Sequence, residues 1–237
     1  MDAQDLYMQR CLKGLGYQMR NWRYTQSLCA AGGSAIDVGA SIGMNSLNYA
    51  DYFDWVHAYE PDPDCYECLL ETLTANQIDS VQTYPVALTN HSDTATMVQF
   101  PRATFANTLK PLGYTGRSRP QITVQCARMD DYTYSELRFI KIDVEGWELA
   151  VLQGATRTIH SHRPVCQVEI KPQMLRRMGA TAQDLFDWFE CMGYVPQHWR
   201  GDVSALVYAP TRITQQGQTH NLTDFWFVPQ ERVDLTH

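Results

Sequence analysis

The fold is decided by the stretch SAIDVGASIG at residues 34–43. Its first five residues are small or apolar apart from Asp37, which is typical of a strand buried in a parallel sheet. Two glycines follow, Gly39 and Gly43, and glycine allows the tight turn that leads from a strand into a helix. Residues 44–53 read as that helix, so the stretch predicts the first strand–helix unit of an α/β protein.

The alternation of strands and helices continues along the chain. Apolar runs bounded by turn residues predict strands at residues 34–38, 55–59, 82–88, 94–100, 121–127, 138–143, 165–170, 204–208 and 225–228. Apolar residues at helical spacing predict helices at residues 44–53, 65–76, 148–160 and 181–192. We therefore expect an α/β fold with a mostly parallel sheet and helices on both faces. The last two strands lack a helix between them, which predicts a terminal antiparallel hairpin.

The N-terminal segment differs from the rest of the chain. Residues 3–30 contain no proline and place apolar side chains at helical spacing. This pattern predicts an N-terminal helical extension over residues 1–30. Because residues 31–237 contain no internal repeat and no linker, we expect them to form one domain.

Composition and charge exclude several classes of function. The 237 residues are 44% hydrophobic, which is globular composition, and carry a formal net charge of −7. Proteins that bind nucleic-acid backbones do so through clustered lysine and arginine, so an acidic chain argues against such a partner. No apolar run approaches the length that spans a bilayer, which argues against a membrane protein. The oligomeric state cannot be read from the sequence.

The N-terminus and the cysteines predict a cytoplasmic protein. The chain begins MDAQDLYMQR, with acids where a secretion signal has a basic and then an apolar segment. Its seven cysteines are odd in number and scattered, which is typical of reduced thiols. Cys65 and Cys68 form a lone C-x-x-C without the second pair that a zinc site requires.

Two strand ends carry residues suited to a nucleoside cofactor. Glu60 ends the second strand, about 20 residues beyond the glycine turn, where a carboxylate can accept hydrogen bonds from both hydroxyls of a ribose. The spacing from Gly39 to Gly43 is not the G-x-G-x-x-G of dinucleotide enzymes. Asp37 would repel a pyrophosphate and attract an amino group. The combination favours S-adenosylmethionine over NAD.

A third strand end holds a cluster of charges in KIDVEGWE, residues 141–148. Lys141, Asp143 and Glu145 alternate, so they share one face while the apolar residues between them face the other way. Charges in a buried strand destabilise it unless they are paired, so they indicate either an active site or a salt-bridge cluster that closes the sheet. We expect Glu169, which ends the next strand, to lie beside them if the two strands are neighbours.

These motifs together resemble those of the FkbM-type S-adenosylmethionine-dependent methyltransferases. The motifs are DVGASIG at 37–43, YEPDP at 59–63, PVALT at 85–89 and IKIDVEGWE at 140–148, the last being the most specific. The resemblance covers residues 34–195 and extends through DFWFVP at 224–229. It does not cover residues 1–30, 101–120 or 209–222, which we expect to determine the substrate.

The resemblance implies a class I methyltransferase (Rossmann-like) fold with a seven-stranded sheet. It also implies transfer of a methyl group to an acceptor oxygen, commonly the hydroxyl of a sugar or another small molecule. The cofactor-binding residues that it implies are Asp37, Gly39, Ala40, Ser41, Gly43, Asn45, Glu60, Pro61, Asp62, Ala87 and Asp143. Of these, Glu60 would bind the ribose and Asp143 would lie where the reactive end of the cofactor meets the acceptor.

The catalytic residues predicted for this transfer are carboxylates at the third strand end. Asp143 or Glu145 would act as the general base, with Lys141 or Glu169 tuning it. His198 is a second candidate base. The carboxylates could also hold Mg²⁺, but we predict no metal ligands in this site. An NAD-dependent oxidoreductase and a non-catalytic cofactor-binding module remain as alternative functions.

Overall fold

The computed structural model describes residues 21–100, 107–109, 119–197 and 224–233. The elements predicted at 204–208, the candidate base His198 and most of the loops at 101–120 and 209–222 lie outside these residues. None of the described helices has the length and apolar character that crossing a membrane requires.

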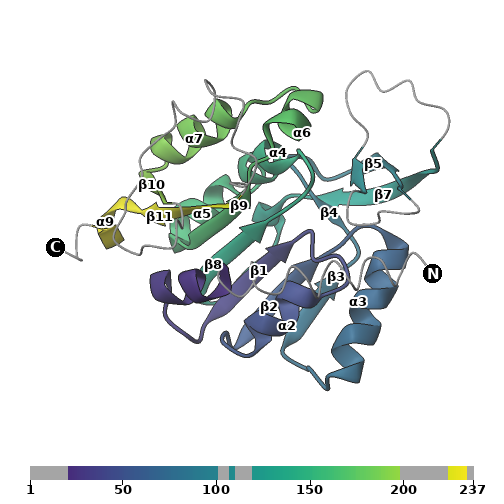
Figure 1. Cartoon of the computed structure of the whole chain (residues 1–237), viewed down its shortest axis with the longest axis horizontal. Coiled ribbons are helices and arrows are strands. Elements are labelled where there is room, and N and C mark those ends of the chain that lie inside the picture. The colour runs from purple at the N-terminus through teal and green to yellow at the C-terminus, as the bar shows by residue number, and fades with distance from the viewer. Residues whose placement is uncertain (1–20, 101–106, 110–118, 198–223, 234–237) are drawn as a thin grey trace.

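A seven-stranded sheet forms the centre of the molecule (Figure 1). Its strand order is β10-β11-β9-β8-β1-β2-β3. All neighbours from β9 to β3 are parallel, whereas β11 is antiparallel to both β9 and β10. The strands are β1 (Ser34–Val38), β2 (Trp55–Tyr59), β3 (Val81–Tyr84), β8 (Leu137–Ile142), β9 (Val165–Glu169), β10 (Tyr194–Gln197) and β11 (Asp224–Pro229). The predicted mostly parallel sheet with a terminal antiparallel hairpin is therefore confirmed.

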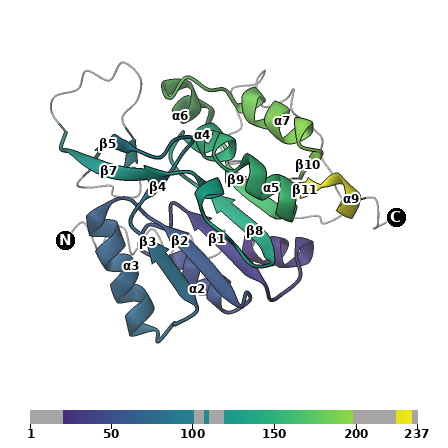
Figure 2. The same cartoon turned by 180° about the vertical axis from the view of Figure 1, so that it is seen from behind.

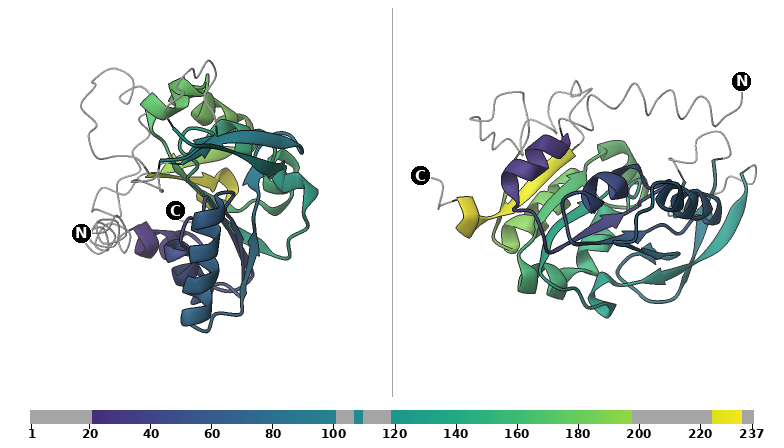
Figure 3. Two further views of the ribbon diagram at one scale, coloured as in Figure 1. Left: turned by 90° about the vertical axis from the view of Figure 1, so that its right-hand side faces the viewer. Right: turned by 90° about the horizontal axis from the view of Figure 1, so that it is seen from below.

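Helices cover both faces of this sheet. A helix at residues 21–28 packs with α2 (Met44–Ala50) against one face, and α3 (Pro63–Ala75) continues this layer beyond them. The other face is covered by α4 (Glu148–Gln153), α5 (Thr156–His162), α6 (Pro172–Arg177) and α7 (Ala182–Cys191). The short helix α9 (Gln230–Val233) follows β11. Figure 3 shows helix 21–28 alongside β11, although the two are far apart in the sequence.

A second, smaller sheet interrupts the connection from β3 to β8. It has the order β4-β7-β5-β6, with β4 (Ala87–Leu88), β5 (Thr94–Val98), β6 (Thr108–Leu109) and β7 (Gln121–Ala127). A 3₁₀ helix (Met129–Asp131) leads from β7 toward β8. Because the chain leaves β3 at the sheet edge and returns at β8 beside β1, the strand order reverses between β1 and β8 (Figure 2). Ligands of open α/β sheets bind at such a reversal, outside the carboxyl ends of the strands.

The structure corrects two predicted elements and adds a strand that the sequence did not predict. The strand predicted at 82–88 is two strands, because Pro85 and Val86 separate β3 from β4 and β4 pairs with β7 in the small sheet. The helix predicted at 148–160 is also two. Gly154 lies between α4 and α5, and a side chain there would collide with the carbonyl oxygen of Thr89. Strand β10 was missed because it contains Pro196, which a sheet accepts only in an edge position such as this one.

Candidate active site

Polar residues from four strands form two rows across one face of the main sheet. Asp37, Lys141 and Gln167 are direct register partners on β1, β8 and β9. One step nearer the carboxyl edge, Glu169 is the register partner of Asp224 on β11, and Asp143 follows the end of β8. The apolar Ile140 and Ile142 belong to the core on the opposite face, so the predicted alternation is confirmed along β8, whereas Glu145 lies in the turn that follows the strand. Strand pairing thus gathers the charges at one edge.

The turn after β1 brings the backbone against neighbouring strand ends. The amides of Gly39 and Ala40 both donate to the carbonyl of Tyr59 at 3.0 Å. Gly39 has a φ of +81°, and a Cβ there would collide with the carbonyl oxygen of Asp143. Gly43 caps α2 with a φ of +89°, and a Cβ there would press on Leu69. Both glycines are therefore required by close packing at the site.

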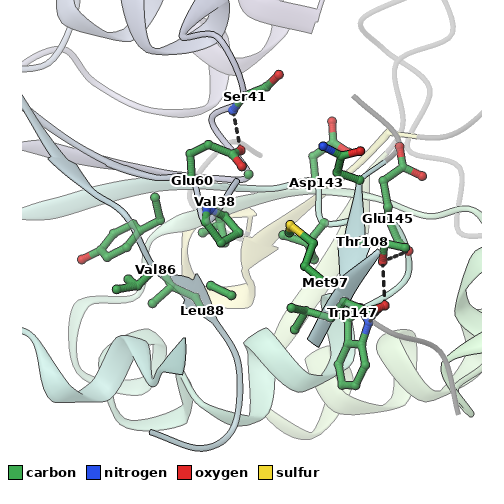
Figure 4. A pocket seen from close by; sticks show the side chains of 17 residues that line it. Val38, Ser41, Glu60, Val86, Leu88, Met97, Thr108, Asp143, Glu145 and Trp147 are labelled. Carbon is green, nitrogen blue, oxygen red and sulfur yellow. Dashed lines mark hydrogen bonds between the residues drawn. The ribbon is translucent and has the colours of Figure 1, made fainter. Parts of the chain in front are cut away.

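Glu60 is held rigidly at the end of β2 (Figure 4). Its Oε2 accepts from the Ser41 amide at 2.9 Å and its Oε1 from the Asp62 amide at 2.8 Å. Burial raises the pKa of Glu60 to about 7, although these two amide donors lower it. Each carboxylate oxygen has a second lone pair, so the group can still accept hydrogen bonds from a ligand diol.

A cleft, called here the first cleft, opens at the carboxyl ends of β1, β2 and β8. The lining residues include seven of the predicted set: Gly39, Ser41, Glu60, Pro61, Ala87, Asp143 and Glu145. Apolar walls are provided by residues of β1, β4 and β5, of the link between β3 and β4 and of the loop after β8, among them Val38, Val86, Leu88, Met97 and Trp147. An apolar slot with a rigid carboxylate at one end suits a nucleoside.

The small sheet closes one side of the first cleft. Thr108 on β6 donates to the carbonyl of Glu145 at 3.2 Å, and the Trp147 indole donates to the Leu109 carbonyl at 3.2 Å. Asn107 donates to Asp62 Oδ2 at 3.0 Å. The sequence placed this segment within residues 101–120, which were expected to determine the substrate, but did not predict its pairing with the loop after β8, because that pairing depends on contacts far apart in the chain.

Two lysines pair with three carboxylates at the edge of the sheet. Lys141 Nζ lies 2.9 Å from Asp143 Oδ2, and Lys171 Nζ lies 2.8 Å from Glu145 Oε1 and 2.7 Å from Glu169 Oε2. Oxygens of the three carboxylates lie within 4.8 Å of one another, as expected for neighbouring strands. The cluster has the oxygen donors that Mg²⁺ prefers, but ammonium groups already neutralise much of its charge.

Asp143 and Glu169 share a hydrogen bond, and their pKa values are shifted in opposite directions. Burial alone would raise the pKa of Asp143, but Lys141, the hydrogen bond from Glu169 and Lys171 hold it well below its usual range. Burial and the Asp143 charge raise the pKa of Glu169. The lysines therefore favour the ionised form of Asp143, and Glu169 holds a proton more tightly than a free glutamate does.

Several predicted residues lie behind the first cleft. Asp37 is fully buried, its Oδ2 accepts from the Ser46 hydroxyl at 2.7 Å, and its Oδ1 has no hydrogen-bond partner among the described residues. Asp62 is also fully buried and caps α3 through its Oδ1. These two residues shape the turns that line the cleft. Ala40 and Gly43 are buried beside them, packing against α3.

A second cleft lies on the face of the sheet that carries the polar rows. It is bounded by helix 21–28, by α2 and by the edge of β8, β9 and β11. Its lining residues are Asn21, Trp22, Asn45, Asn48, Tyr49, Lys141, Asp143, Gln167, Glu169 and Asp224. Asn45 and Lys141 were predicted from the sequence, whereas Asn48, Gln167 and Asp224 carried no local signal. Asp143 lines both clefts.

We compared the sequence and the structure of the chain with those of known proteins. The sequence profile of the methyltransferase FkbM domain matches residues 37–196. No curated protein sequence matches the chain. The methyltransferase FkbM structure from Methylobacillus flagellatus KT superposes with a TM-score of 0.54 at 18% identity, covering 86% of this chain and 47% of that one. This chain therefore spans about half the length of that protein.

Two further structures share the fold at low identity. SMU.1697c of Streptococcus mutans, solved in complex with SAH, has a TM-score of 0.52 at 8% identity and covers 88% of this chain and 94% of that one. An rRNA methylase from Streptococcus thermophilus has a TM-score of 0.51 at 8% identity, covering 88% and 92%. The profile match extends over more than half of the chain and includes the motifs at 37–43, 59–63, 85–89 and 140–148, so the chain belongs to the FkbM methyltransferase family.

Proposed function

We propose that this chain transfers a methyl group to an oxygen of a hydroxylated small molecule or carbohydrate. The cofactor is S-adenosylmethionine, as the sequence predicted. The observation that carries the proposal is the position of Asp143, an ionised carboxylate that lines both clefts. A group in this position can contact the donor from one side and the acceptor from the other.

The residues of the first cleft fit the cofactor. Glu60, fixed by two backbone amides, would accept hydrogen bonds from the ribose hydroxyls. The apolar wall around Ala87 would hold the adenine, and the turn at Gly39 and Ser41, which also lines the cleft, would contact the methionine part. When bound, S-adenosylmethionine supplies a methyl group on a positively charged sulfur.

Asp143 acts on the acceptor in this proposal. It accepts the hydroxyl proton as the new carbon–oxygen bond forms, and its negative charge also favours the cationic donor beside it. Lys141 keeps Asp143 ionised, and the raised pKa of Glu169 favours its protonated form, which donates a hydrogen bond to Asp143. Glu145, the other candidate base, lines only the first cleft and is bound by Lys171, so we assign it to the cofactor side.

Replacement of Asp143 by Asn tests this assignment. The variant should lose methyl transfer while it retains binding of S-adenosylhomocysteine, because the amide has the same shape but cannot take up the proton. The control is Glu136→Gln, which removes an exposed carboxylate at the start of β8. Full turnover by Asp143→Asn would refute the assigned base.

The two alternative functions are separated by ligand binding and turnover. An oxidoreductase would be stabilised by NAD, whereas a methyltransferase is stabilised by S-adenosylhomocysteine, by about 2.7 kcal/mol at 100 times Kd. A non-catalytic module would bind S-adenosylhomocysteine without consuming S-adenosylmethionine on any acceptor. Thermal shift and a hydroxylated acceptor panel together decide among the three.

A small-molecule acceptor is favoured over RNA. The chain carries a net charge of −7, and the edge around Asp143 is lined by carboxylates, which repel phosphate.

Cys29, Cys126, Cys166 and Cys191 carry free thiols. These thiols support the predicted cytoplasmic location, which imaging of a fluorescent fusion would test.

A further inference from the structure

The three residues of β6 and its start, 107–109, connect strand ends on the two sides of the first cleft. Asn107 Nδ2 donates to Asp62 Oδ2 at 3.0 Å, shortly after β2. The Leu109 carbonyl accepts from the Trp147 indole at 3.2 Å, in the loop after β8. Since β2 and β8 are the two neighbours of β1, this segment bridges the strands that flank β1. All three of its residues line the first cleft, and we call them the strap.

Asp62 holds one end of the strap. Its carboxylate is fully buried and accepts four hydrogen bonds from described residues. The Oδ1 accepts from the amides of Asp64 and Cys65, both at 3.1 Å, and so caps α3. The Oδ2 accepts from Gln99 Nε2 at 2.7 Å and from Asn107 Nδ2 at 3.0 Å. One carboxylate oxygen therefore serves the helix and the other serves the small sheet, and together the four donors fill the acceptor positions of the group.

The Asn107 side chain is fixed in the orientation that donates to Asp62. Its Oδ1 accepts from the Phe100 amide at 2.7 Å, so its Nδ2 is the group that faces the carboxylate. Phe100 follows β5, which pairs with the strap and contributes Met97 to the wall of the first cleft (Figure 4). The hydrogen bonds of Asp62 thus position both strands of the small sheet that line the cleft.

Asp62 also contacts the carboxylate that we propose for the ribose. Its backbone amide donates to Glu60 Oε1 at 2.8 Å. Because Asp62 lies behind the first cleft, its effect on a bound molecule passes through Glu60 and the strap. This one residue connects the group that would bind the cofactor with the strands that cover it.

We propose that Asp62 is a positioning residue that holds the strap and β5 against the first cleft and thereby sets the rate at which the cofactor dissociates. This inference rests on the proposed assignment of the first cleft to the cofactor. Hydrogen bonds to a carboxylate are stronger than those to a neutral acceptor, so Asp62 holds the wall of the cleft firmly. A wall that is held less firmly loses its contacts with the bound cofactor more often, which raises the dissociation rate.

Replacing Asp62 by Asn separates the two halves of the carboxylate. The amide oxygen of the new side chain still caps α3, whereas its nitrogen faces the donors of Gln99 and Asn107 and cannot accept from them. We expect the dissociation rate of S-adenosylhomocysteine to rise about 10-fold, since two hydrogen bonds to the small sheet are lost. Gln99→Met removes one of these bonds, leaves the helix cap intact and should raise the rate about 3-fold.

A second substitution restores the contact with the partners exchanged. In the double variant Asp62→Asn with Gln99→Glu, the carboxylate at position 99 accepts from the amide at position 62, and the net charge equals that of the wild type. We expect its dissociation rate to return to within about 3-fold of the wild-type rate. Gln125→Met, at an exposed position on β7 of the same small sheet, is the control. Surface plasmon resonance on the full chain measures the rates, and urea denaturation measures the free energy of unfolding.

Three results would overturn the inference. A merely structural role would lower the free energy of unfolding of Asp62→Asn and Gln99→Met without changing either dissociation rate, and would leave the proposed function intact. A double variant that dissociates as fast as Asp62→Asn would show that the bond between positions 62 and 99 is not the cause. A Kd for S-adenosylhomocysteine that is unchanged in Glu60→Gln would refute the assignment of the first cleft to the cofactor, and the inference with it.

Discussion

Replacing Glu60 by Gln should weaken cofactor binding and remove part of its dependence on pH. The ribose hydroxyls would donate to Glu60, and they bind the ionised carboxylate more strongly than the protonated one. Because burial raises the pKa of Glu60 to about 7, protonation competes with the ligand near neutral pH. At pH 8 the carboxylate is mostly ionised, and at pH 6 only about a tenth of it is ionised, which lowers affinity about tenfold, or about 1.4 kcal/mol.

The glutamine of Glu60→Gln neither takes up a proton in this pH range nor carries a negative charge. Exchanging two hydrogen bonds to a charged acceptor for two to a neutral amide costs about 2 kcal/mol, which is roughly a 30-fold rise in Kd at pH 8. Isothermal titration of S-adenosylhomocysteine at pH 6, 7 and 8 measures both effects. Glu67→Gln, on the exposed side of α3, removes the same charge without touching the cleft and is the control. If Glu60→Gln keeps the pH slope of the wild type, the role given to this carboxylate is refuted.

Three further predictions follow from the packing and charge of the site. Gly39→Ala should destabilise the fold by more than about 3 kcal/mol in urea denaturation, because positive φ and collision with a carbonyl oxygen act together. Gly193→Ala, at a φ of +71° with its nearest atom at 3.6 Å, should lose only about 1–2 kcal/mol, and equal losses would contradict this account. Burial raises the pKa of Glu148 to about 7, so the folded state binds more protons than the unfolded state, and stability should fall as pH rises from about 4.5 to 7. Glu148→Gln should reduce that fall by about 3 kcal/mol at most, as measured by urea denaturation at pH 5 and 8, and an unchanged slope would argue against it. EDTA should leave methyl transfer unchanged, since Lys141 and Lys171 already supply positive charge at the carboxylates; activity lost on chelation and restored by Mg²⁺ would show the opposite.

Much of the fold could be predicted because the signals are local. The strand–turn–helix at 34–43 depends on glycines whose positive φ is a property of the turn itself. The helix at Ala182–Cys191 was placed to within one residue because Thr181 and Asp184 form a capping box at its start. Errors occurred where distant contacts decided the outcome, as at Gly154, which packs against a carbonyl from another part of the chain.

The candidate site was predictable in part for the same reason. Glu60 and Asp143 end strands, and parallel strands bring their carboxyl ends to one edge whatever their order. Asp37 was also found, but burial places it behind the first cleft, since its strand runs between two others. Gln167 and Asp224 were missed because a glutamine inside a strand and an aspartate at the start of one are common in any sheet.

The sequence by itself determined the alternation of strands and helices, the four motifs that resemble those of the family and the carboxylates at the strand ends. Only the tertiary structure decided which strands are neighbours, because register is fixed by pairing and packing between segments far apart in the chain. That pairing sets Lys141 against Asp37 and Gln167 and joins Asp143 to Glu169. It also places a helix from the N-terminal segment beside β11. The charge of Asp143 and the second cleft are consequences of this arrangement.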